Sequence, residues 1–168
     1  TAVVIGAMLV APLMGPLVAA GCSLVQGNLS LFRRSLAVIL IGIGIGFAAS
    51  LIFGALNPGF EPTLEIEARG KADLLDLGIA FFSGMTAAYA IGRSHVMTTI
   101  AGVAIAAALV PPLAVVGLAL THGRPLISYN AAILLTTNLV AIILGAAIVF
   151  RILQVHVSRQ GAGLPIWV

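Results

Sequence analysis

The sequence predicts an all-α fold, a polytopic transmembrane bundle of about five helices that forms one domain over residues 1–168. Hydrophobic residues make up 61% of the chain and charged residues only 8%, whereas soluble domains carry about 25% charged residues. The hydrophobic residues gather in runs long enough to cross a bilayer, which takes roughly 20 apolar residues. These runs lack the alternation of polar and apolar positions that a membrane β-barrel requires. The lipid bilayer is therefore the first predicted partner.

Polar turns divide the chain into its predicted spans. Gln26-Gly27-Asn28 follows the first apolar run, Asn57-Pro58-Gly59 the second and Arg93-Ser94-His95 the third. Residues 60–73 form a polar segment that holds most of the acidic residues. The predicted spans are residues 3–25, 35–56, 74–92, 96–121 and 126–150.

Two of the five spans carry prolines in their interiors, Pro12 and Pro16 in the first and Pro111 and Pro112 in the fourth. A proline inside a helix has no N–H to donate and pushes away the carbonyl four residues earlier. Both helices are therefore predicted to be broken at their prolines. Lipid cannot satisfy the freed carbonyls, so the breaks should face protein or a wet cavity. The freed carbonyls belong to Met8, Pro12, Ala107 and Ala108.

The two proline-bearing segments align without gaps at an offset of 96 residues, which indicates an internal repeat. The first repeat covers about residues 3–56, the second about residues 96–150, and the span at 74–92 lies between them. The positions in register include a proline and several glycines: Pro16 with Pro112, Gly6 with Gly102, Gly21 with Gly117 and Gly27 with Gly123.

The basic residues predict an orientation. Cytoplasmic loops are enriched in Lys and Arg, and Arg33 and Arg34 are adjacent in a predicted short hairpin. The start of the chain is therefore expected outside and the C-terminus in the cytoplasm. The first span then enters the membrane from outside and the fourth from the cytoplasm, so the repeats are inverted. Inverted repeats with interrupted helices point to a transport site near the bilayer midplane.

Asn138 stands at the centre of the fifth span, where its amide is costly to leave without partners. One interpretation is a hydrogen bond between helices, which contributes only about 0.6 kcal/mol in membrane proteins. The other is a group that binds solute beside the broken helices. In the third span, Ser83 and Thr86 with Gly84 could line the same cavity, although hydroxyls in helices often bond to their own backbone.

Several classes of protein are excluded by what the sequence lacks. It has no nucleophile paired with a base, no phosphate-binding loop and no intramembrane pair of carboxylates, so we expect no enzyme and no cofactor. The lone Cys22 offers neither a disulfide nor the spacing of a metal site, so no metal is expected. Without a cluster of Lys and Arg beside aromatic residues, no nucleic-acid partner is expected either.

Four pieces of the chain resemble a known family. Residues 3–16, with both prolines of the first span, are similar to the signature of a prokaryotic membrane family known as domain of unknown function 389. Residues 79–90, residues 102–113 and Asn138 match the same family. The resemblance implies a multi-pass protein of a prokaryotic plasma membrane, and it brings no established activity. It also implies one more helix upstream, which would pair with the third span and complete two inverted three-helix repeats, and in many members a soluble N-terminal domain.

Two functions follow as hypotheses. The first is a transporter or channel for an ion or small polar solute of either charge, with its site at the two proline-interrupted helices. The alternative is a membrane scaffold or anchor for a sensory or regulatory soluble domain, which transports nothing. In either case Gly42 and Gly46 form a GxxxG pair that predicts a homo-oligomer. The predicted site comprises Met8, Pro12, Gly15, Pro16, Ser83, Gly84, Thr86, Ala107, Ala108, Pro111, Pro112 and Asn138.

Overall fold

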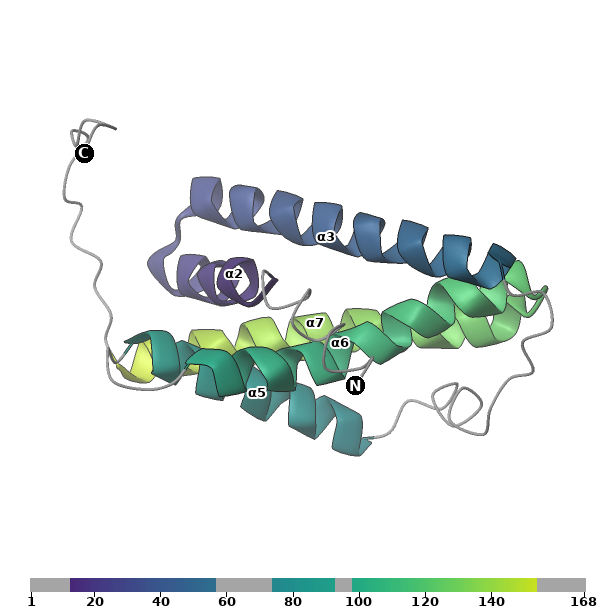
Figure 1. Ribbon diagram of the computed structural model, residues 1–168. Helices are drawn as coiled ribbons and strands as arrows, with labels where there is room; N and C mark the ends of the chain where they lie inside the picture. The colour runs from purple at the N-terminus through teal and green to yellow at the C-terminus, as the bar shows by residue number, and fades with distance from the viewer. Residues whose placement is uncertain (1–12, 57–73, 93–97, 154–168) are drawn as a thin grey trace.

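The computed structural model describes residues 13–56, 74–92 and 98–153, and within these ranges every element is a helix (Figure 1). Among the described residues, four helices are long and apolar enough to cross a membrane, whereas α2, with 13 residues, is shorter. The all-α prediction is therefore confirmed, and the chain is a multi-pass membrane protein. The described helices are α2 (Met14–Gln26), α3 (Leu29–Leu56), α5 (Leu74–Gly92), α6 (Thr98–Thr121) and α7 (Pro125–Ile152).

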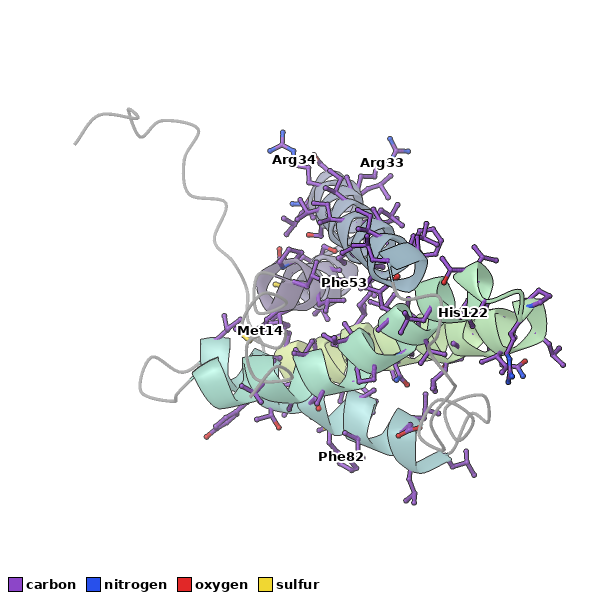
Figure 2. All side chains as sticks on the ribbon, turned by 45° about the vertical axis from the view of Figure 1, so that its right-hand side comes forward. Met14, Arg33, Arg34, Phe53, Phe82 and His122 are labelled. Carbon is purple, nitrogen blue, oxygen red and sulfur yellow. The ribbon has the colours of Figure 1, made fainter. Side chains whose placement is uncertain are left out.

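The boundary between the first two helices corrects one prediction. Arg33 and Arg34 lie within α3, which begins at Leu29, and not in a hairpin before it. The side-chain Oδ1 of Asn28 accepts a hydrogen bond from the backbone N–H of Leu31 at 3.1 Å, and no proline or glycine follows that would delay the helix. Both arginines remain exposed and point away from the bundle at one end of α3 (Figure 2).

The offset of 96 residues that aligns the two proline-bearing segments also relates the ends of the helices that contain them. Gly27 and Gly123 follow α2 and α6, and they have nearly equal positive φ angles of 65° and 66°. Glycine adopts this left-handed conformation without the steric penalty of a Cβ atom, so it is the preferred residue for ending a helix in this way. The helices that follow, α3 and α7, each have 28 residues and begin at Leu29 and Pro125.

Helix α7 is the centre of the bundle. It packs against α5, α6 and α2, while α3 lies on the far side against α2 and α6 (Figure 1). Half of the most apolar stretch of α7 is buried, compared with 11% for α3. Most of the α3 surface is therefore left for lipid or for another chain.

The predicted pair Gly42 and Gly46 is used inside the protomer. The space beside Gly42 is filled by the side chain of Leu13, which directly precedes α2, and the space beside Gly46 by that of Leu113 from α6. Small residues let neighbouring helices approach closely, and here both neighbours belong to the same chain. The expected homo-oligomer would need a different surface, such as the exposed face of α3 that carries Ile41, Ile45 and other large apolar side chains.

Helices α5 and α7 approach each other through two further glycines. Gly84 of α5 lies against the backbone of Ile142, and Gly145 of α7 lies against the backbone of Phe81. A side chain at either position would collide with backbone atoms, which cannot rotate away. This crossing fixes α5 against the central helix, although the outer face of α5 stays open and Phe82 projects from it (Figure 2).

Candidate functional site

Helix α6 is continuous through Pro111 and Pro112, which corrects the prediction that these prolines break the fourth span. The fixed φ of proline is compatible with a helix, and the damage comes from the missing N–H and the displaced carbonyl. Prolines are tolerated in transmembrane helices when a neighbouring group satisfies the freed carbonyl. A neighbouring helix supplies such a group here.

That group is the amide of Asn138. Its Nδ2 atom donates a buried hydrogen bond to the carbonyl oxygen of Ala108 at 2.9 Å. Ala108 precedes Pro112 by four residues, so this carbonyl is one of those that a proline deprives of their helical donor. Of the two interpretations of Asn138, the hydrogen bond between helices therefore exists, and it joins the middle of α7 to the middle of α6.

The other end of the same amide has no partner in the part of the chain that the structure describes. Asn138 is 2% exposed, and among the residues that the structure describes its Oδ1 atom accepts no hydrogen bond. Most buried polar atoms in proteins are paired, and leaving an acceptor unpaired costs about 1–3 kcal/mol. Asn138 thus has a structural role through its nitrogen and an open acceptor in its oxygen.

The surroundings of Asn138 are neutral and closely packed. Leu134, Leu135 and Ile142, one turn away on α7, are buried, and so is Pro112 on α6. The described charged side chains lie at or near helix ends, far along the sequence from this level of α6 and α7. They are Arg33, Arg34, Asp76, Arg124 and Arg151. Within the same described ranges, no group of His, Cys, Asp or Glu side chains could hold a metal ion.

The residue before α2 and the residue after Pro112 pack against the same stretch of α3. Leu13 and Leu113 insert beside Gly42 and Gly46, which are one turn apart on α3. Leu13 directly precedes α2, and Leu113 directly follows Pro112. The two proline-bearing segments therefore converge on α3, although α2 and α6 themselves hardly touch.

The predicted residues of the first span are only partly described. Met8 and Pro12 lie outside the described residues. Gly15 is exposed and Pro16 half-buried in the first turn of α2, where a helix has no intrahelical acceptor for its N–H groups and a proline costs little. In α6, Ala108 and Pro112 are buried, Pro111 is half-buried and Ala107 is exposed.

The predicted site residues of the third span do not share a cavity with Asn138 in the described structure. The hydroxyls of Ser83 and Thr86 donate to their own helix, to the carbonyls of Ile79 at 2.6 Å and Phe82 at 2.9 Å. Both residues line an apolar groove of about 530 Å³ between α5 and α6, which Asn138 does not line. Gly84 serves the contact with α7.

A second apolar groove, of about 560 Å³, runs between α5 and α7. Thr136 and Thr137 line it, and their hydroxyls donate to the carbonyls of Ala132 and Ile133 on their own helix. Because these hydroxyl protons are used within α7 and the other lining residues are apolar, the groove suits lipid acyl chains better than a polar solute.

One polar contact between helices was not anticipated. The hydroxyl of Ser128 in α7 donates to the carbonyl of Val116 in α6 at 2.9 Å. Together with the Asn138 bond it joins these two helices at two levels. Its sequence signal is weak, because a serine near the start of a helix is more often a local capping residue.

The fold and this interior define the protein as a multi-pass helical membrane protein with a buried amide at the centre of its bundle. The chain belongs to the family described as Domain of unknown function (DUF389), which it matches over residues 8–144, and this confirms the resemblance. It is 32% identical over 149 residues to an uncharacterised protein of Methanocaldococcus jannaschii. That alignment covers 89% of the chain but 46% of the relative, so the chain spans about half of the relative's length. No solved structure matches the chain.

Proposed function

We propose that the protein is a transporter or channel for an ion or small polar solute, with Asn138 as the binding residue. The observation that carries this proposal is the open Oδ1 atom, buried among apolar side chains at the middle of α7. Polar groups kept inside a membrane at such a cost commonly mark solute pathways. The proposal assigns the protein no catalytic role.

The offset of 96 residues supports the same function. Equal lengths of α3 and α7, equivalent left-handed glycines and matching prolines are what an internal repeat would produce. If the two repeats are inverted, their interface near the bilayer midplane is where transporters of this kind bind their solutes. Asn138 and Pro112 lie near the middle of their helices, which supports a site at such an interface.

Purified protein in proteoliposomes tests the proposal. Fluxes of potassium, ammonium, sodium, chloride and phosphate are measured for the wild type, for Asn138→Leu and for Thr136→Val. We expect at least one flux above that of protein-free liposomes, and its loss in Asn138→Leu because the leucine has no oxygen. Thr136→Val is the matched control, since this exposed hydroxyl bonds only to its own helix in the described structure. Absence of every flux, or full flux in Asn138→Leu, contradicts the proposal.

A closely related comparison separates binding from folding. Asn138→Leu also removes the donor to Ala108, so a loss of flux could reflect a damaged bundle. Pro112→Ala returns a backbone N–H to the Ala108 carbonyl. The single variant Pro112→Ala and the double variant Pro112→Ala/Asn138→Leu therefore both satisfy this carbonyl, and they differ only in the presence of the Asn138 amide. We expect the double variant to fold as well as the single one and to lose any flux that the single variant retains.

The orientation stays a proposal, with the start outside and the C-terminus in the cytoplasm. In a Cys22→Ala background, we expect Ser30→Cys to react with membrane-impermeant thiol reagents only from the cytoplasmic side. Thr63→Cys, in the acidic segment, should react only from outside. Permeabilised cells provide the control for accessibility, and the opposite labelling pattern would reverse the orientation.

The second candidate function is the scaffold or anchor, and one observation favours it. The described interior around Asn138 is filled by leucine, isoleucine and proline side chains, with α5 and α7 in backbone contact. Such packing needs no solute to be stable. Failure to detect any flux, together with an unchanged fold in the Pro112→Ala/Asn138→Leu variant, would favour this function over transport.

A further inference from the structure

The direction of the Asn138 side chain determines which of its atoms can meet a ligand. A carbonyl oxygen can only accept hydrogen bonds, so the atom that faces Ala108 must be the amide nitrogen. This bond holds the amide in one orientation and turns Oδ1 away from that carbonyl. The atom without a partner is therefore an acceptor, and it requires a donor or a positive charge.

The described structure around this atom offers little to an anion. No described arginine or histidine lies within the middle of α6 or α7, because these side chains are found at or near helix ends. The other common source of attraction for anions is a helix N-terminus. A break at Pro111 and Pro112 would create such a terminus, but α6 continues through both prolines and has none there. The start of α2 also lies within the bundle, and Leu13, which directly precedes it, packs beside Gly42 of α3.

We infer that Asn138 Oδ1 contacts the transported species and that this species is a small monovalent cation, such as ammonium or an alkali ion, and not an anion. Amide and carbonyl oxygens replace the hydration shell of such cations in selective channels. Ammonium satisfies an acceptor through its N–H groups, and potassium does so through charge alone. The inference rests on the proposed function and names the chemical class of its solute.

Thermal unfolding of the purified protein in mild detergent tests the inference without measuring transport. Chloride salts of potassium, ammonium and choline are compared at equal ionic strength, so that only the cation changes. A ligand that binds only the folded state raises the unfolding temperature. We expect ammonium or potassium to raise it in the wild type and in Pro112→Ala, relative to choline, and to have no such effect in Pro112→Ala/Asn138→Leu.

The outcomes separate the solute class from the transport function. No cation-specific rise, or a rise that persists without Asn138, overturns the inference. A rise with ammonium alone assigns the site to hydrogen-bond donors, whereas a rise with both cations assigns it to positive charge, and either result supports the inference. Exchange of chloride for gluconate with choline held constant tests anions. An anion flux that depends on Asn138 overturns the inference and leaves the proposed function intact. Cation binding without any flux supports a monovalent cation as the ligand and overturns the proposed transport.

Discussion

Gly84→Leu is expected to prevent α5 from packing on α7. The added side chain would meet the carbonyl and Cα atoms of Ile142, which belong to the backbone of the central helix. Overpacking of a well-packed core costs about 1–3 kcal/mol when side chains can adjust and occasionally more. The backbone in the middle of α7 cannot move aside without shifting its contacts with α2 and α6. We therefore expect the free energy of unfolding to fall by an amount near the upper end of this range.

Thermal unfolding in detergent, followed by circular dichroism, measures this loss. Gly78→Leu is the matched control, because Gly78 lies on the same helix and an added Cβ there meets nothing within 4 Å. We expect the control to unfold at or above the wild-type temperature, since leucine favours a helix more than glycine does. An unfolding temperature for Gly84→Leu equal to that of the control would mean that the close approach of α5 and α7 is wrong.

The helices could be predicted from the sequence because a bilayer imposes a minimum length on apolar runs. The predicted span at 74–92 has the same bounds as α5, and the turn at Gly27 was recognised from its residue type. The charges of Arg33 and Arg34 predict a loop, so the predicted start of α3 lies several residues after the observed one at Leu29. Arginine is a good helix former, and side-chain charge alone does not end a helix near a membrane surface.

The course of α6 could not be predicted from α6 alone. The rule that proline breaks a helix describes an isolated helix, whereas the donor that compensates here comes from a residue on the next helix of the chain. The sequence indicated both the freed carbonyl of Ala108 and the central amide of Asn138, but not that one would satisfy the other. Likewise the GxxxG pair predicted a close helix contact, and only the fold shows that Leu13 and Leu113 fill it.

The bond between Asn138 and Ala108 predicts a coupling between two substitutions that can be measured. Asn138→Leu leaves the Ala108 carbonyl buried without a donor, which costs about 1–3 kcal/mol in soluble proteins. Hydrogen bonds between membrane helices average about 0.6 kcal/mol with a maximum of about 1.7 kcal/mol, so we expect a loss of about 1 kcal/mol in the free energy of unfolding. Pro112→Ala supplies the missing N–H from within α6, and Asn138→Leu in that background should cost much less.

A double-mutant cycle isolates this bond from the other effects of the substitutions. Asn138→Leu also removes the unpaired Oδ1 atom, and this removal by itself stabilises the folded state. The effect is the same in both backgrounds and cancels in the cycle. Pro112→Ala leaves a small cavity at a buried position, and this effect likewise cancels. Unfolding of the four proteins in the same detergent should therefore give a coupling free energy of about 1 kcal/mol, within the range found for residues in direct contact. Equal costs of Asn138→Leu with and without Pro112 would show that the amide does not compensate the proline, and the continuity of α6 would then need another cause.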